Sequence, residues 1–147
     1  MGGSLRSTND AIVSTVKIMN YAITRTVQDT DMAALKERAV EALRTEGFGV
    51  LTEIDLQATL KKKLDKDHLP HLILGACNPE FADQVVTLEP LISTMLPCNV
   101  TIRQLPGGGH VVAAIDPAAA MGAVENPAIE PIAAQVRDAL TRVIEKI

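Results

Sequence analysis

The chain has 147 residues, of which 47% are hydrophobic and 22% charged, and its formal net charge is −4. This length suits one domain with a buried core, and the composition excludes a disordered tail or a fibre. Only Tyr21, Phe48 and Phe81 are aromatic, so the chain lacks the set of exposed rings on which bases or sugars stack. The acidic balance also argues against a phosphate-binding surface, and we expect no nucleic-acid partner.

Targeting signals are absent from the sequence pattern. No segment approaches the roughly 20 consecutive apolar residues that cross a bilayer, so we expect no membrane insertion. The N-terminus lacks the charged start, the apolar middle and the cleavage site of a secretory signal. The two cysteines are too few for a disulfide scaffold and fit a reducing cytoplasm. We interpret residues 1–19 as a flexible N-terminal extension or an expression remnant, and residues 20–147 as a single domain.

The first half of the chain predicts a strand, a helix, a second strand and a second helix. Residues 21–27 alternate as a strand does, and the period then changes to that of a helix that ends before Gly47, which suits a left-handed C-cap. Residues 48–54 predict the second strand, and Asp55 can cap a short amphipathic helix over residues 56–64. The first helix can be capped by Asp29, Thr30 or Asp31, and its buried stripe is Leu35, Ala39, Ala42 and Leu43.

The second half predicts three strands and two further helices. An apolar strand over residues 71–76 leads to Asn78 and Pro79, a favoured N-cap followed by a favoured first helical residue, so a helix should run to about Glu89. Strands at 99–105 and 111–115 flank the turn residues Pro106, Gly107, Gly108 and Gly109 and predict a hairpin. The last helix begins near Asn126 or Glu130 and carries the stripe Ile132, Val136, Leu140 or Ala139, Val143 and Ile147.

Together these elements predict an α+β fold. The expected architecture is a two-layer sandwich with a mixed four- or five-stranded sheet and helices packed mainly on one face. Short glycine-rich turns between strands fit a hairpin better than a phosphate loop, because a phosphate loop needs a helix directly after it.

Three strings make the chain recognisable: GFGVLTEID at 47–55, LGACNP at 74–79 and LPCNV at 96–100. With the later pairs Asp116-Pro117 and Met121-Gly122, they resemble the bacterial and archaeal family catalogued as domain of unknown function number 302. The resemblance covers about Tyr21 to Ile147. It implies a two-layer α+β fold and homodimers, and it supplies no accepted catalytic residue.

Cys77 and Cys98 are the candidate reactive thiols. Cys77 lies beside the first turn of a predicted helix, where unpaired N–H groups favour the thiolate. Cys98 opens a neighbouring strand after Pro97, so a reversible disulfide, or a shared soft-metal or sulfur-carrying site, is one interpretation. The alternative, which we favour, is that both are structural residues, because cysteine is among the most buried residue types.

The histidines add little chemistry. His68 and His71 are separated by Pro70, which removes the helical two-histidine metal face, and no metal site is predicted. His71 could join a metal or haem pocket with Cys77 if the strand ends converge. His110, at the hairpin, is interpreted as a surface residue. The sequence identifies no cofactor.

Three carboxylates stand at strand ends. Glu53 and Asp55 at one end and Asp116 at another could act as acid–base groups, although helix capping and solvation are the simpler interpretation. The chain has no nucleophile elbow, dinucleotide fingerprint or zinc-finger spacing. Whether it is an enzyme therefore stays open.

Two functional hypotheses follow. The first is a dimeric binding module for a small, mostly apolar ligand. Its candidate pocket residues, beside the two cysteines, are Asn78, Pro79, Pro97, Asn99, Glu53, Asp55 and Asp116. The second is a thiol-dependent redox or sulfur-transfer protein that uses Cys77 with Cys98 as the supporting residue. A purely structural subunit of a larger complex is a third and weaker hypothesis.

Overall fold

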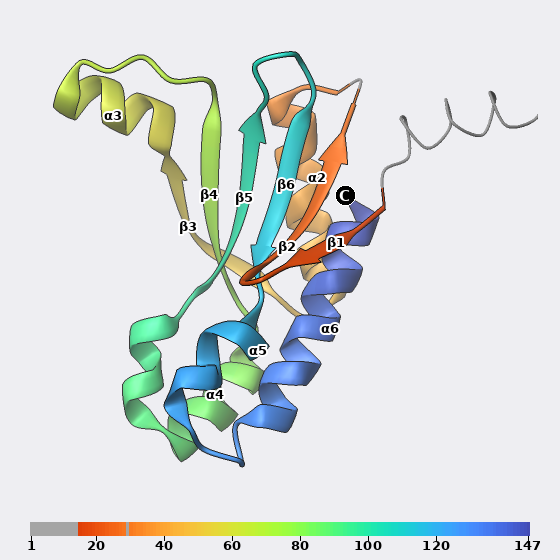
Figure 1. Ribbon diagram of the computed structural model, residues 1–147, viewed down its shortest axis with the longest axis vertical. Coiled ribbons are helices and arrows are strands. Elements are labelled where there is room, and N and C mark those ends of the chain that lie inside the picture. The colour runs from red at the N-terminus through yellow and green to blue at the C-terminus, as the bar shows by residue number, and fades with distance from the viewer. Residues whose placement is uncertain (1–14, 29) are drawn as a thin grey trace, which may run out of the picture.

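The computed structural model describes residues 15–28 and 30–147, and they form one antiparallel sheet of six strands in the order β1-β2-β6-β5-β4-β3 (Figure 1). The strands are β1 (Lys17–Met19), β2 (Ala22–Val27), β3 (Gly49–Asp55), β4 (His71–Cys77), β5 (Cys98–Gln104) and β6 (His110–Ile115). The α+β prediction is confirmed. The prediction of a mixed sheet with four or five strands is wrong, because every pair is antiparallel and a sixth strand is present.

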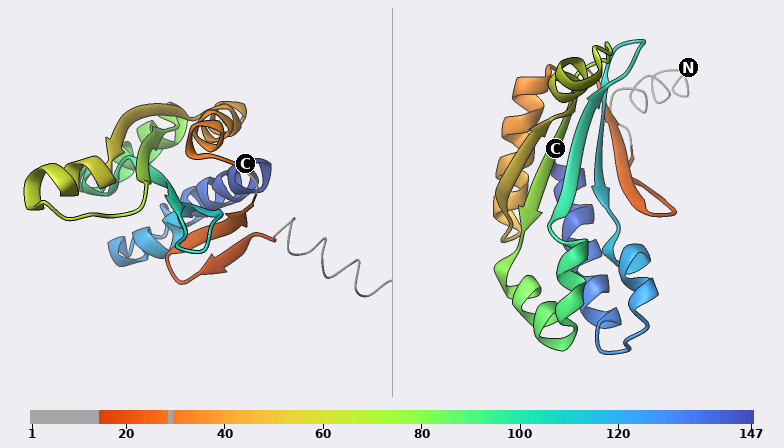
Figure 2. Two further views of the ribbon diagram at one scale, coloured as in Figure 1. Left: turned by 90° about the horizontal axis from the view of Figure 1, so that it is seen from above. Right: turned by 90° about the vertical axis from the view of Figure 1, so that its left-hand side faces the viewer.

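The helices are α2 (Met32–Thr45), α3 (Leu56–Leu64), α4 (Pro79–Leu88), α5 (Pro117–Ala120) and α6 (Glu130–Lys146), with 3₁₀ helices η1 (Pro90–Met95) and η2 (Met121–Val124). α2 and α6 pack against each other and on one face of the sheet, while α4, α5 and η1 gather at one end of it (Figures 1 and 2). In the described part of the chain, no helix lies across the middle of the opposite face. That face of the sheet is therefore open to contact with another molecule.

The core lies between the sheet and α2 with α6. Alternate strand residues, such as Val100, Ile102 and Val112, are fully buried toward the helices. The stripe predicted for α2 is confirmed, since Leu35, Ala39, Ala42 and Leu43 are its buried residues. The stripe predicted for the last helix is also buried along its length, at Ile132, Val136, Ala139, Leu140, Val143 and Ile147.

Helix caps follow the predicted residues. The side chain of Asp31 accepts a hydrogen bond from the Ala34 amide at 2.7 Å, and Asp55 does the same for Ala58 at 2.9 Å. Gly47, with φ +82°, follows α2 in the left-handed conformation. The local signals of helix start and stop were thus sufficient to place α2 and α3.

α3 confirms the predicted bounds, 56–64, and the predicted cap Asp55. Its apolar residues Leu56 and Leu60 are half-buried, and none of its residues is fully buried. It connects the antiparallel neighbours β3 and β4 and projects beyond the sheet edge (Figure 1). Because α3 joins the end of β3 to the start of β4 at the same end of the sheet, no second layer of structure covers it. Its apolar residues therefore stay partly exposed.

The predicted N-terminal extension, residues 1–19, lies mostly outside the described residues. Within it, Lys17–Met19 forms β1, whose Lys17 is in register with Thr24 of β2. The predicted hairpin between β5 and β6 is present, and Gly108 and Gly109 both have positive φ there. β5 and β6 pair with each other and are the two central strands of the sheet.

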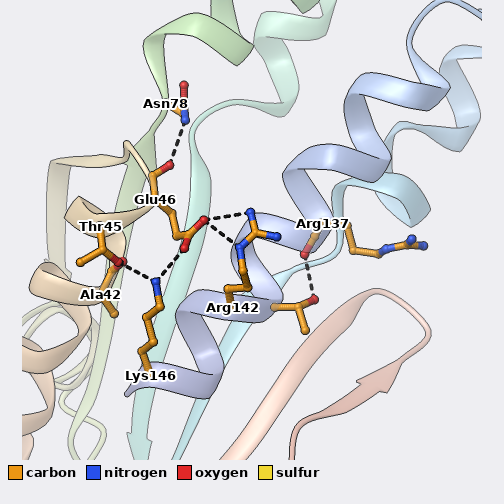
Figure 3. Close-up of polar contacts among 8 residues, drawn as sticks. Ala42, Thr45, Glu46, Asn78, Arg137, Arg142 and Lys146 are labelled. Carbon is orange, nitrogen blue, oxygen red and sulfur yellow. Dashed lines mark hydrogen bonds and ion pairs between the residues drawn. The ribbon is translucent and has the colours of Figure 1, made fainter.

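An ion-pair cluster joins the end of α2 to α6 (Figure 3). The Glu46 carboxylate accepts hydrogen bonds from Arg142 at 2.9 Å and from Lys146 at 2.7 Å. Its side chain is 14% exposed. These hydrogen bonds, that from Arg142 first, hold the pKa of Glu46 below its ordinary value. The Glu46 carbonyl oxygen also accepts from the Asn78 side chain at 3.2 Å, which adds α4 to the same junction.

We expect Glu46→Gln to lower the free energy of unfolding at pH 7 by about 1 kcal/mol, the upper range for ion pairs near a surface. Because the folded pKa of Glu46 is lowered, the stabilisation is present above the unfolded pKa and is lost as the pH falls through the folded one. Urea unfolding at pH 7 and pH 3 checks this. The control is Glu37→Gln, at an exposed glutamate of α2 that forms no ion pair within the described residues. An equal difference between Glu46→Gln and the natural protein at both pH values would contradict the assignment.

Candidate functional site

The face of the sheet that lacks helices is hollowed into a groove of about 680 Å³. Its floor is one row of residues across three strands: Thr101 of β5 is in register with Ala113 of β6, and Ala113 with Thr24 of β2. These side chains are short and half-buried. Because the side chains in this row are short and those nearer the two ends of the strands are longer, a space remains above the middle of the sheet.

The walls of the groove come from the two ends of the strands and from one side. At one end, Met95, Leu96 and Pro97 line it from η1 and the segment that follows. On the side of β2, the turn residue Tyr21 lines it. β1 and the adjoining turn curve away from α2, which raises this side above the floor (Figure 2). The end of the groove that Met95, Leu96 and Pro97 line is therefore mainly apolar.

The other end of the groove is basic. His71 of β4 and Arg103 of β5 are in register, so their side chains share this face. Burial lowers the pKa of His71, and the nearby charges of Arg103 and His68 lower it further. The groove thus has an apolar end and a basic end.

The two cysteines line a different cavity, on the side of α4. It measures about 20 Å³, and apart from the cysteines and Asn78 its lining is apolar, with Phe48, Val85 and Met121 among the lining residues. Such a space is large enough for about one water molecule, whereas small-molecule pockets measure roughly 300–1,000 Å³. The cavity beside Cys77 and Cys98 is too small for a ligand.

Both cysteines are free thiols, and Cys98 is buried. Burial, and to a smaller extent the neighbouring Cys77, raises the pKa of Cys98 to about 11. The thiolate is the reactive form of cysteine, so Cys98 is poorly suited to attack or to resolve a disulfide at neutral pH.

We expect Cys98 to react with iodoacetamide far more slowly than Cys77 in the native protein at pH 8, because Cys98 is buried and its pKa is about 11. Mass spectrometry of the alkylated peptides, with and without denaturant, measures both rates. The denatured protein is the control, since the two sites should then react alike. Rapid native alkylation of Cys98 would contradict its placement in the core.

The other candidate pocket residues divide into two groups. Pro97 and Asn99 line the groove. Asn78 instead caps α4 by accepting hydrogen bonds from the amides of Glu80 and Phe81, and Pro79 is the first residue of that helix. Asn78 and Pro97 also line the small cavity beside Cys77 and Cys98. The candidate residues are therefore divided between the groove, that cavity and the helix caps.

The three carboxylates have partners away from the groove. Glu53 forms an ion pair with Lys36 of α2 at 2.6 Å. Asp55 caps α3, and Asp116 is buried and caps α5 through the Ala118 amide at 3.0 Å. Helix capping was the simpler interpretation for Asp55 and Asp116, and the structure confirms it.

Two histidine interpretations are wrong. His71 and Cys77 lie at opposite ends of β4, about 20 Å apart along a strand, so they cannot share a metal or haem pocket. His110, interpreted as a surface residue, is buried, and its Nδ1 has no hydrogen-bond partner among the described residues. Its position at the start of β6 turns it toward the helices. Within residues 15–28 and 30–147, no group of three His, Cys, Asp or Glu side chains could hold a metal ion.

Sequence reasoning missed the centre of the groove. Thr24, Thr101, Ala113 and Arg103 were not candidate residues. A signal was present in the alternation of Asn99, Thr101 and Arg103 with buried valine and isoleucine, which marks one polar face of β5. Its meaning depends on which strands lie beside β5, and that is not a local property.

The fold and the groove define an α+β sandwich protein with one antiparallel sheet and one sheet face free of covering helices. The chain belongs to the family described as "Domain of unknown function DUF302", which matches residues 23–147. This confirms the resemblance found in the motifs. The function of the family, and of this chain, is not established.

A solved relative supports the assignment. The chain is 30% identical in sequence to an uncharacterized conserved protein DUF302 from Bacillus stearothermophilus, with a TM-score of 0.80 to its crystal structure. The match covers 85% of this chain and 96% of the other. A search of curated proteins found no significant match. None of the helices in the described ranges combines the length and the apolar character needed to span a membrane.

Proposed function

We propose that the protein is a binding module that holds a small, mostly apolar ligand in the groove on the open face of the sheet. The observation that carries the proposal is the groove itself, with a volume of about 680 Å³ and a floor of short side chains. This volume is in the range of small-molecule sites, and such sites combine apolar walls with a few polar groups. Thr101, Asn99 and Arg103 supply those polar groups.

The thiol-dependent alternative has less support. It needs an accessible, ionisable pair of thiols, whereas Cys98 is buried and its pKa is raised. Neither cysteine lines the groove. In the proposed function both thiols are packing residues, and replacing them should leave ligand binding intact.

A homodimer in the cytoplasm is part of the proposal. β3 is an edge strand of the sheet, and it exposes the apolar side chains of Leu51 and Ile54. An exposed apolar edge favours pairing with another chain, here a second copy. No residue of β3 lines the groove, so a dimer through this edge would leave the groove open. Sedimentation velocity measures the mass in solution and so tests the dimer. The two free cysteines fit a reducing compartment such as the cytoplasm.

Two measurements on the purified protein test the function. The native mass of the protein is expected to exceed its denatured mass by the mass of a copurified small molecule. Once that molecule has been removed, the two masses should agree, and the groove is then empty. Titration with the apolar fluorescent probe N-phenyl-1-naphthylamine is then expected to show saturable binding. Cys77→Ser should bind the probe as the natural protein does. Absence of saturable binding to the stripped protein would refute the proposal, and loss of binding in Cys77→Ser would favour the thiol alternative.

A further inference from the structure

The charge of the groove is one-sided. Among the described residues that line it, Arg103 is the only one with a permanent charge, and none is an aspartate or a glutamate. In residues 15–28 and 30–147, no carboxylate forms an ion pair with the Arg103 guanidinium. A guanidinium can make two parallel hydrogen bonds to a carboxylate or a phosphate. This one is available to a ligand.

A second cavity meets the groove at the same place. It measures about 490 Å³, lies between α3 and the ends of β4 and β5, and shares His71 and Arg103 with the groove. Among the described residues that line it, Asp67 is the only carboxylate, and it is paired with Lys61 at 3.0 Å. The imidazole of His68 also lines this cavity. His71 and Arg103 thus line both the groove and this second cavity.

The rest of the groove suits an apolar chain. The floor residues Thr24, Thr101 and Ala113 separate Arg103 from Met95 and Pro97 at the far end. From Arg103 to Asn99 the strand rises about 13 Å, at roughly 3.3 Å a residue. An extended aliphatic chain of medium length fits between the basic end and the apolar end.

We infer that the ligand is an amphipathic anion, whose carboxylate or phosphate head binds Arg103 beside His71 and whose aliphatic tail lies over the threonine and alanine floor. This rests on the proposed function and adds the chemical class of the ligand. The geometry that supports it has two parts. The Arg103 guanidinium, which has no ion-pair partner among the described residues, lies at one end of a floor without charged side chains, and the apolar residues Met95 and Pro97 lie at the other.

The experiment compares three probes that share one tail: decanoate, decyl phosphate and decanol. Displacement of N-phenyl-1-naphthylamine from the stripped protein measures each affinity. We expect both anions to bind at least about tenfold more tightly than decanol, as a charge-assisted hydrogen bond requires. The ratio of the two anions identifies the preferred head group.

The variant Arg103→Met keeps an unbranched, flexible side chain and removes the guanidinium and its charge. We expect it to lose most of the preference for the anions, by about tenfold, while its affinity for decanol changes by less than about twofold. Arg44→Met, on the exposed surface of α2, is the matched control and should keep the preference. Unchanged decanol binding shows that the variant is folded.

The outcomes separate the two proposals. Equal affinity of the natural protein for decanol and the two anions, or an anion preference that persists in Arg103→Met, would overturn the inference and leave the binding function standing. If none of the probes displaces the dye and the dye itself does not bind, the proposed function fails and the inference fails with it.

Discussion

Replacing Leu140 by alanine is expected to lower the free energy of unfolding by about 2–5 kcal/mol, the range for buried leucines. Leu140 is 0% exposed and lies in the stripe by which α6 contacts the sheet and α2. Removing its branched end loses apolar burial and leaves a cavity, because neighbours on a helix and a sheet can close only part of it. Urea unfolding followed by circular dichroism measures the change.

The matched control is Leu91→Ala in η1. Leu91 is 81% exposed, so its truncation should change the unfolding free energy by no more than about 0.5 kcal/mol. A change below about 1 kcal/mol in Leu140→Ala would contradict the placement of α6 in the core. So would a comparable loss in both variants.

Filling the floor of the groove should abolish binding. In Ala113→Trp, an indole projects from the central strand β6 between Thr101 and Thr24, which are its register neighbours. It occupies the space above both and separates the apolar end from Arg103. We expect the affinity for N-phenyl-1-naphthylamine and for decanoate to fall at least about a hundredfold, since overlap with a packed ring cannot be relieved by a small shift of the sheet.

The control for this variant is Ala33→Trp, at an exposed position of α2 on the other face of the sheet. It adds the same indole and should bind like the natural protein. Thermal unfolding of both variants establishes that each is folded. A folded Ala113→Trp with undiminished affinity would place the ligand somewhere other than the groove.

The helices could be predicted because their signals are local. Apolar residues at three- and four-residue spacing defined the stripes of α2 and α6, and Asp31, Asp55 and Asn78 act as caps through residues only two or three positions away. α3 has the predicted bounds, but its apolar face is only half-buried. Its apolar residues follow a helical period, but whether a second layer exists to bury them depends on the sheet edge, which the pattern does not contain.

The sheet was predicted less well. Five strands were recognised by alternation or by runs of branched and apolar residues, whereas β1 has three residues and falls within a segment rich in polar side chains. The hairpin of β5 and β6 was predicted correctly. The prediction of a mixed sheet was wrong, because a strand, helix and strand in sequence can return either by a parallel crossover or, as at α3, to an antiparallel neighbour. Such choices depend on contacts between residues far apart in the chain.

The candidate site shows the same limit. Cys77 and Cys98 attracted attention because thiols have chemistry wherever they lie, yet packing places them at a cavity of about 20 Å³. Thr101 and Ala113 have little chemistry of their own, and they matter because β5 and β6 pair in one register. Pro97 and Asn99, which the sequence did single out, reach the groove from its end.

The most direct test of ligand binding in the groove is an amide chemical-shift titration of the stripped protein, labelled with ¹⁵N, with decanoate. We expect saturable shifts centred on the groove-lining residues of β5 and β6, with Thr101, Arg103 and Ala113 among the largest, and small shifts in α2. Saturable shifts that centre instead on Cys77, Cys98 and the start of α4, or no saturable shift at all, would contradict it.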